Sequence, residues 1–332
     1  MISSATILLP ELITAITDMI SFGPVPSRRL GKSLGINNIV SPKVCSYNCI
    51  YCQVGKTIRK SCSRKLFFEP ALIYENTARH LESLSQENYP DYLTFVSNGE
   101  PVLDINLGRS IMLLKKLGIP VAVITNASLL SSGKVRDDLS KADWVSLKTD
   151  AADNKVWQRI NRPSRKLDFT THIESIFQFA SDYKGRLHTE TMLVRGVNDS
   201  AENISGLAAV IKNISPLTAY LAIPIRPPAV SGVKVPDIDR LNFAWQHFTQ
   251  QNLKAEFLTG FEGTETGYTG NIYEDILNIT AVHPLREDSL MRLLEKDKAG
   301  YHVVESLINQ KLIKSVLYEG KRFFIREYHY EN

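Results

Sequence analysis

The residues best suited to chemistry in this sequence are four cysteines that lie close together. Cys45, Cys49 and Cys52 follow a C-x3-C-x2-C spacing, and Cys62 is the fourth cysteine of the 332-residue chain. Three neighbouring thiolates can bind one metal centre, but a structural zinc ion takes four ligands. Cys62 is available as a fourth, although its spacing is unusual for zinc. Three thiolates instead suit a [4Fe-4S] cluster whose fourth iron stays open to a substrate or cofactor.

A second set of polar residues follows the apolar, β-branched segments that we expect to be strands. The carboxyl ends of parallel strands meet at one edge of a sheet or barrel, so we expect these side chains to lie together there. Each is also a common turn or ion-pair residue, so a purely structural role is the alternative. The residues are Asn98, Gly99, Glu100, Asn126, Lys148, Asp150 and Asn198.

The elements that must position these residues alternate along the chain. Expected strands cover residues 34–40, 91–96, 121–125, 144–147, 187–194, 219–225 and 255–259. Helical spacing is found over residues 107–117, 169–180, 204–214 and 241–250. The repeated strand–helix order predicts an α/β fold with a parallel sheet. We expect a partial (β/α)6 TIM-type barrel over residues 21–270, with an open doubly wound sheet as the alternative.

The two ends of the chain differ from this pattern. Residues 288–296 and 301–310 have helical spacing, and residues 314–318 and 322–326 alternate around a Glu-Gly turn. Two helices and a two-stranded ribbon predict a winged-helix-like C-terminal domain over residues 275–332. We expect a helical extension over residues 1–20.

The positive charge is concentrated around the cysteines. Residues 21–68 contain nine Lys and Arg and no Asp or Glu, although the whole chain has a net charge of only +4. Such a stretch can offset the negative charge of a thiolate cluster, or bind an anionic substrate, or form a solvated basic face. Arg28 and Arg29, on a proline-rich loop that we expect to enter the barrel, are the candidate substrate-binding residues.

Composition limits the class of protein. The chain is 43% hydrophobic and 22% charged, which is typical of a globular protein and excludes disordered and collagen-like chains. No apolar run approaches the roughly 20 residues of a membrane span. The first 20 residues lack a basic start and a cleavage site, so we expect a cytoplasmic protein.

The cysteine spacing, with Tyr51 before the third cysteine, resembles the radical S-adenosylmethionine (SAM) superfamily. Residues 97–101 (SNGEP) resemble that family's Gly-Gly-Glu-Pro element, with Asn98 in place of the first glycine. The resemblance covers roughly residues 23–260. It implies a [4Fe-4S] cluster on Cys45, Cys49 and Cys52.

The resemblance also implies SAM as the second cofactor. Gly99 would let backbone approach it, and Glu100 would pair with its ammonium group. Its ribose and carboxylate would be bound by Asn126, Lys148, Asp150 and Asn198. The reaction implied is reductive cleavage of SAM to a 5′-deoxyadenosyl radical that abstracts hydrogen from a substrate. A flavodoxin or ferredoxin-type reductant would supply the electron.

A closer resemblance is to a subgroup described as iron–sulfur oxidoreductases or wyosine-synthase-like proteins. It is carried by residues 22–31, 33–35, 195–199 and 283–287, together with Gln53. Wyosine synthases have a second set of cluster cysteines, which this chain lacks.

Three functions follow from these features. The first is radical modification of RNA, with tRNA favoured by the basic stretch and the winged-helix-like tail. The second is radical modification of a protein or peptide, such as activation of a glycyl-radical enzyme. The third is a non-enzymatic zinc-binding nucleic-acid adaptor.

Overall fold

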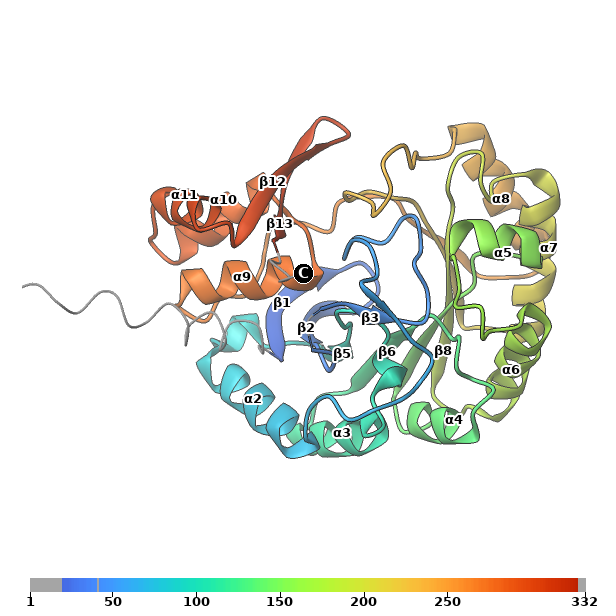
Figure 1. Cartoon of the computed structure of the whole chain (residues 1–332), viewed down its shortest axis with the longest axis horizontal. Coiled ribbons are helices and arrows are strands. Elements are labelled where there is room, and N and C mark those ends of the chain that lie inside the picture. Colours follow the sequence, from blue (N-terminus) through green and yellow to red (C-terminus); the bar gives the residue numbers. More distant parts are fainter. Residues whose placement is uncertain (1–19, 41, 328–332) are drawn as a thin grey trace, which may run out of the picture.

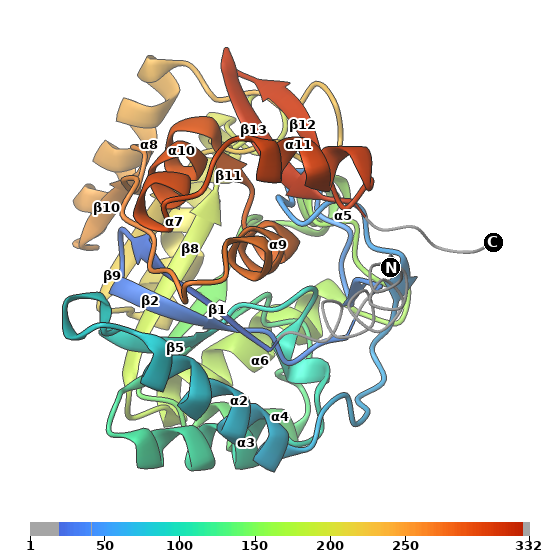
Figure 2. The same cartoon turned by 90° about the vertical axis from the view of Figure 1, so that its left-hand side faces the viewer.

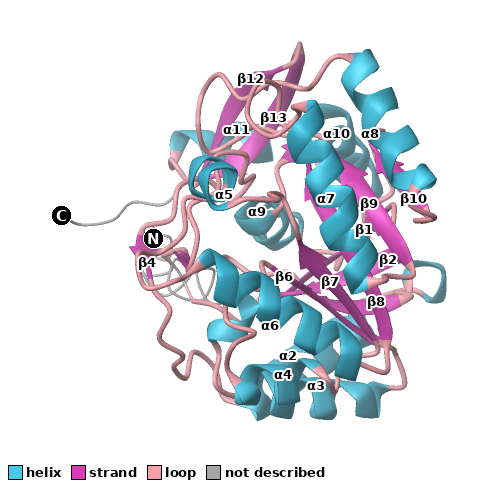
Figure 3. Cartoon of the chain, turned by 90° about the vertical axis from the view of Figure 1, so that its right-hand side faces the viewer, coloured by secondary structure: helices cyan, strands magenta, loops and turns pink. Residues whose placement is uncertain are grey.

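The computed structural model describes residues 20–40 and 42–327. Its main element is an eight-stranded sheet that curls into a half-barrel, with helices along its outer side (Figures 1 and 3). This confirms the α/β barrel and excludes the doubly wound alternative, which needs helices on both faces. The expected helical extension over residues 1–20 lies outside the described residues, apart from Ile20.

The strands run in the order β1-β2-β5-β6-β7-β8-β9-β10. β1 and β2 are antiparallel, and every later neighbour is parallel. The strands are β1 (Ser21–Ser27), β2 (Gly31–Ile36), β5 (Tyr92–Phe95), β6 (Val121–Thr125), β7 (Trp144–Lys148), β8 (Arg186–Met192), β9 (Thr218–Ala222) and β10 (Ala255–Leu258).

The helices between the parallel strands bury an apolar face against the sheet, apart from α5, which packs against the cysteine loop. They are α2 (Pro70–Ser83), α3 (Leu107–Leu114), α4 (Gly133–Leu139), α5 (Asn154–Ile160), α6 (Phe169–Asp182), α7 (Ala201–Ile214) and α8 (Ile238–Gln250), with 3-10 turns at Gln86–Asn88, Pro101–Leu103 and Lys115–Leu117. Several begin at an Asp or Ser whose side chain accepts a hydrogen bond from the first turn, as Asp168 and Ser200 do.

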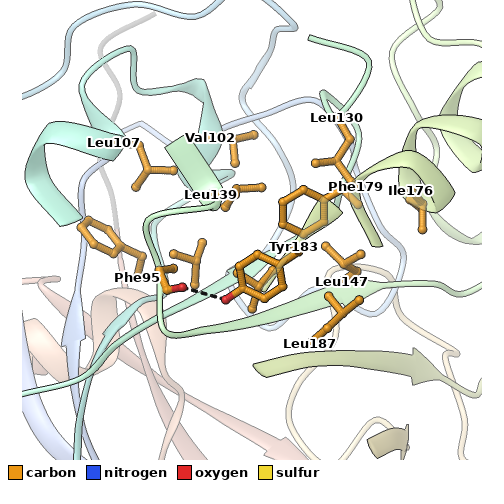
Figure 4. Packing of buried hydrophobic residues seen from close by; sticks show 14 of the residues in the cluster. Phe95, Val102, Leu107, Leu130, Leu139, Leu147, Ile176, Phe179, Tyr183 and Leu187 are labelled. Carbon is orange, nitrogen blue, oxygen red and sulfur yellow. Dashed lines mark hydrogen bonds between the residues drawn. The ribbon is translucent and has the colours of Figure 1, made fainter. Parts of the chain in front are cut away.

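The core between sheet and helices fixes the strand ends that carry the polar residues. Figure 4 shows part of it, where Phe95, Leu147 and Phe179 are fully or almost fully buried. Tyr183 stacks on Phe179 and donates its hydroxyl to the carbonyl of Ala142 at 2.8 Å. Each fully buried side chain of this size contributes about 1.5–3 kcal/mol. The strand ends are therefore held by a rigid scaffold.

The sequence analysis did not identify the helices α2, α4 and α5, and two further elements also differ from its expectation. Residues 21–27 form the antiparallel edge strand β1 rather than a loop, because an edge strand tolerates the missing N–H groups of its two prolines. Arg28 and Arg29 therefore lie in the tight turn between β1 and β2. The second difference is α9 (Ile272–Val282), which the sequence did not reveal because it is buried on nearly all sides and has no polar stripe.

The C-terminal part has the order α9, β11 (Leu285–Arg286), α10 (Glu287–Lys296), α11 (His302–Asn309), β12 (Ile313–Tyr318) and β13 (Lys321–Arg326). Its antiparallel sheet has the order β11-β13-β12, which confirms the predicted helices and ribbon. Its apolar cluster also includes Val25 of β1, and α9 packs against both β1 and β13 (Figure 2). The C-terminal elements therefore cover the edge of the half-barrel, while the exact domain boundaries stay a prediction.

Candidate active site

The cysteine loop lies between β2 and α2 and is anchored at the end of β5. The two-residue strand β3 (Val44–Cys45) pairs with β4 (Arg59–Lys60). The amide of Val44 donates to the carbonyl of Asn98 at 3.3 Å, and the amide of Glu100 donates to the carbonyl of Val44 at 3.1 Å. This close approach requires Gly99, which has φ +143° and whose hypothetical Cβ would lie 1.7 Å from the Val44 oxygen. Gly99 thereby sets the position of Cys45.

The remaining two cysteines of the motif are held by turns and by the segment after α5. The amide of Cys52 donates to the carbonyl of Cys49 at 3.2 Å, and the amide of Ile50 donates to the carbonyl of Ile160 at 3.0 Å. All four cysteines are free thiols. Three of them line one cavity of about 250 Å³, whereas Cys62 packs against the main core and is not part of its lining.

Each of the three cavity sulfurs has a hydrogen-bond donor. The ammonium of Lys43 lies 3.0 Å from Cys52 Sγ, and the Nδ2 atoms of Asn126 and Asn161 lie 3.5 Å from Cys45 Sγ and Cys49 Sγ, respectively. Burial raises the pKa of Cys45 and Cys49 to about 12, so anionic sulfurs here need a bound cation. Soft ligands, sulfur-directed donors and a neighbouring cation fit an iron–sulfur cluster.

No group of three His, Cys, Asp or Glu side chains in residues 20–40 and 42–327 converges to hold a single metal ion. A [4Fe-4S] cluster binds each cysteine through a different iron, so its three ligands need not converge on one point.

Glu100 lies at the end of the cavity that adjoins Cys45. Its carboxylate is 2% exposed and accepts hydrogen bonds from the hydroxyl of Thr125 at 2.6 Å and from the amide of Asn126 at 2.8 Å. Burial raises its pKa to about 7 against the effect of these donors. A buried carboxylate that lines a cavity is suited to bind a cationic group.

Asp150 connects the cysteine loop to the barrel. Its carboxylate accepts hydrogen bonds from the hydroxyl of Tyr51, from Asn161 Nδ2 at 2.7 Å and from the amide of Met192 at 2.8 Å. Lys148 lies 3.4 Å from it, and its ammonium also lies over the ring of Tyr51. Tyr51 and Lys148 line the cavity, whereas Asp150 lies behind them.

Asn198 also lies behind the cavity. It is fully buried, accepts the amide of Val194 at 2.8 Å and donates to the carbonyls of Asp150 and Met192. These bonds hold the turn after β8, and Asn198 is not among the residues that line the cavity. The structure thus brings most of the predicted residues together and places Asp150 and Asn198 in the supporting layer.

The other end of the cavity is lined by arginines and glutamates. Arg28 lies 3.2 Å from Glu262, which also pairs with Arg226. Arg29 and Lys148 both pair with Glu190, and burial lowers the pKa of Arg29 to about 10. The sequence analysis did not identify Glu190, Arg226 and Glu262. The only sequence signal for any of these three residues was that Glu190 lies in the otherwise uncharged interior of the expected strand over residues 187–194.

A second cavity of about 180 Å³ adjoins this end. It shares Ile225, Arg226 and Glu262 with the first cavity and is otherwise lined largely by residues of the C-terminal elements. Tyr318 of β12 donates its hydroxyl to the carbonyl of Pro224 at 2.9 Å, and Arg286 lies over the ring of Phe261. The C-terminal elements therefore contribute to the wall next to the cavity.

No helix within residues 20–40 and 42–327 combines the length and the apolar character that crossing a bilayer requires.

Comparisons with known proteins agree with this geometry. The family model described as "Radical SAM superfamily" matches residues 39–207. A UPF0026 protein of Methanocaldococcus jannaschii is 41% identical over 92% of this chain and 96% of its own length. A crystal structure of a radical SAM methyltransferase from Sphaerobacter thermophilus is 16% identical and covers 68% of this chain and 66% of its own, with a TM-score of 0.52. A structure of TYW1 with a lysine–pyruvate adduct is 16% identical and covers 90% of this chain and 82% of its own, with a TM-score of 0.45. The family match, which covers about half of the chain, shows that this chain belongs to the radical SAM superfamily.

Proposed function

We propose that this radical SAM enzyme modifies RNA, with tRNA as its substrate class. The observation that carries the proposal is a group of partly buried arginines at the end of the cavity away from Glu100. The arginines are Arg28, Arg29 and Arg226, and the acidic residues that line the same end are Glu190 and Glu262. A substrate with a phosphate fits this excess of positive charge.

Arg28 is the cation best placed to bind a phosphate. Its Nη2 atom pairs with Glu262, but its Nη1 atom is buried and has no hydrogen-bond partner among the described residues. Leaving a buried guanidinium donor unpaired is costly, and an anionic ligand in the cavity would satisfy it. The winged-helix-like elements beside Arg226 would supply the surface for the rest of the RNA.

The opposite end of the cavity is where we propose that the cofactors bind. Cys45, Cys49 and Cys52 would hold three irons of the cluster and leave the fourth for SAM. When bound and reduced, this pair supplies one-electron cleavage of SAM and with it the radical that abstracts hydrogen. Glu100 would bind the ammonium of SAM, while Asn126 and Lys148 would contact its more distant polar groups. Gly99 and Tyr51 would shape the wall around it, with Asp150 and Asn198 supporting that wall.

The RNA proposal is tested by the salt dependence of tRNA binding. We expect the wild type to bind unfractionated tRNA with an affinity that falls steeply with salt. Arg28→Met should weaken binding and reduce the slope of log K against log salt by about one. Lys116→Met, at an exposed position on the outer side of the sheet, is the control. Filter binding measures both quantities.

Salt-independent failure of the wild type to bind tRNA would refute this proposal. A glycyl-radical signal in a protein fraction, seen by electron paramagnetic resonance after incubation with SAM and reductant, would instead support the protein-modifying alternative.

The raised pKa of Glu100 predicts a pH dependence for SAM binding. Only the ionised carboxylate pairs with an ammonium group, and its pKa is raised to about 7. The affinity for SAM should therefore fall as the pH is lowered below about 7, by up to about tenfold per pH unit. Glu100→Gln should bind more weakly at neutral pH and lose this dependence. Isothermal titration of the reconstituted proteins with SAM checks both expectations. If the wild type and Glu100→Gln showed the same pH dependence of SAM affinity, Glu100 would not be the partner of the ammonium group.

Lys43 predicts an effect on the reduction potential of the cluster. Burial alone would lower the pKa of Lys43, but the neighbouring thiolate charges, Cys52 first, raise it above its usual value. Its charge near the sulfurs stabilises the more negative, reduced cluster. Lys43→Met should lower the midpoint potential by on the order of tens of millivolts, and Lys43→Arg should largely preserve it. An anaerobic redox titration measures this, with Lys65→Met as the exposed control.

A further inference from the structure

The outer side of the cysteine loop carries a concentrated basic patch that the proposed function does not use. Two segments distant in sequence form it, residues 56–60 and residues 162–166, and neither contains an Asp or a Glu. We define the basic patch by its six exposed cations, which are Lys56, Arg59, Lys60, Arg162, Arg165 and Lys166.

The two segments are joined by hydrogen bonds that also hold the cysteine loop. Lys60 donates through its ammonium to the carbonyl of Arg162 at 3.0 Å. The amide of Asn48 donates to the same carbonyl at 3.3 Å, and Arg162 has φ +46°, in the left-handed region that few arginines adopt. The amide of Ser164 donates to the carbonyl of Ser46 at 2.9 Å. The two segments are thus hydrogen-bonded to each other and to the residues that lie between the first two cysteines of the motif.

The basic patch is close to the cysteines but separate from the cavity. Lys60 is the strand partner of Cys45, and the amide of Ser61 donates to the carbonyl of Cys45 at 3.0 Å. None of the six cations lines the cavity into which the three sulfurs point. Figure 3 shows β4, which carries Arg59 and Lys60, at the outer edge of the molecule below α5. The loop therefore presents its sulfurs on one side and its positive charge on the other.

We propose that the basic patch is the docking surface of an acidic one-electron carrier protein of the flavodoxin or ferredoxin type. The proposal rests on the family's need for a reductant and not on the identity of the substrate. Electron transfer slows steeply with distance, so a carrier must approach the cluster from a surface close to its ligands. The basic patch provides such a surface without blocking the cavity.

Charge and exposure favour this partner over RNA. The six cations of the basic patch carry a charge of +6 in a chain of net charge +4, so the rest of the chain carries +4 − 6 = −2. An acidic protein is therefore steered towards the cysteine loop and repelled elsewhere. Ile58, which is 55% exposed between Lys56 and Arg59, adds an apolar contact of the kind found in small protein interfaces. An RNA base needs access to the cavity, which these residues do not border.

The test measures the rate at which a photoreduced bacterial flavodoxin reduces the reconstituted cluster. The reduction is monitored as a loss of visible absorbance in an anaerobic stopped-flow instrument. The wild-type rate should fall steeply with ionic strength. Arg59→Glu combined with Arg165→Glu should slow reduction by about tenfold at low salt. The matched control, Lys116→Glu combined with Lys184→Glu, reverses two exposed charges that precede β6 and β8, at the opposite end of the sheet from the strand ends that face the cysteine loop, and should change the rate by less than about twofold. Dithionite, which needs no docking, should reduce all three proteins equally.

A second measurement does not depend on the loaded cluster. The affinity of the apo chain for oxidised flavodoxin should fall in the patch variant and not in the control, and the affinity of all three proteins for unfractionated tRNA should be the same. Equal flavodoxin rates in the three proteins would overturn the proposal. A selective loss of tRNA binding in the patch variant would overturn it too and assign the basic patch to RNA. Neither result depends on turnover of a substrate, so the RNA proposal stands or fails separately.

Discussion

Cys49→Ser is expected to abolish both the cluster and the formation of 5′-deoxyadenosine, whereas Cys62→Ser should preserve them. The sulfur of Cys49 lines the cavity and accepts a hydrogen bond from Asn161, but Cys62 packs against the core outside that cavity. A serine hydroxyl is a harder and far less acidic ligand than a thiol, so it does not replace the sulfur on iron. The iron content should therefore fall from about four per chain to below about one.

The same pair of variants separates the cluster from zinc. A four-thiolate zinc site would use Cys62 as its fourth ligand, and Cys62→Ser would then lose metal as readily as Cys49→Ser. Iron, zinc and sulfide analysis after anaerobic reconstitution provides the measurement. Because the contacts of Cys62 are apolar, its replacement should cost no more than about 1 kcal/mol of unfolding free energy. Equal metal loss in the two variants would contradict three-cysteine binding.

The parts of the fold that the sequence predicted are those with strong local patterns. The buried strand over residues 121–125 agrees with β6, and the expected strand at residues 144–147 agrees with β7 apart from its last residue. The edge strand β1 and the helix α9 were missed for opposite reasons. The prolines of β1 led to the prediction of a loop, and α9 has no amphipathic stripe in its sequence because it is buried on nearly all sides. Only their tertiary neighbours determine both elements.

The same distinction between local sequence patterns and tertiary contacts applies to the residues of the active site. The cysteines were predictable because their spacing is local, and Glu100 was predictable because it lies in the short polar segment that follows a strand. The pairing of Lys148 with Glu190 depends on the register of β7 with β8, where these two residues are direct partners. The pairing of Arg28 with Glu262 brings together residues from opposite ends of the barrel. No pattern along the chain specifies such pairs, because they arise only when the sheet closes.

The curvature of the sheet thus has a direct functional consequence. It brings the β1–β2 turn, which carries Arg28 and Arg29, to the same cavity as the ends of β8 and β9. The C-terminal elements then cover the edge that the half-barrel leaves exposed. Gln53 links the two parts, since it donates to the carbonyl of Val282 at 3.1 Å and accepts from Arg226 at 2.7 Å. The residue after the third cysteine therefore contacts both the cavity wall and the C-terminal helix α9.

Gly99→Ala, after β5, is expected to be the most damaging single-methyl change among the glycines that contact or lie in the cysteine loop. Its Cβ would lie 1.7 Å from the carbonyl oxygen of Val44, and its φ of +143° is a conformation that residues with a side chain rarely adopt. Relieving the clash would move Val44, and with it Cys45, away from the end of β5. We expect a loss of about 3 kcal/mol or more in unfolding free energy, together with loss of the cluster.

Gly55→Ala is the matched control, because Gly55 lies in the cysteine loop itself with φ +81° and its hypothetical Cβ meets no atom within 4 Å. It carries the backbone strain without the clash, so it should cost only about 1 kcal/mol and keep its iron. Urea denaturation of the apo chains and iron analysis after reconstitution measure the two effects. If both variants lost the same stability and retained iron, the close contact between Gly99 and Val44 would not be what positions Cys45. The predicted difference between the variants isolates that contact, since both replace a glycine of positive φ with alanine.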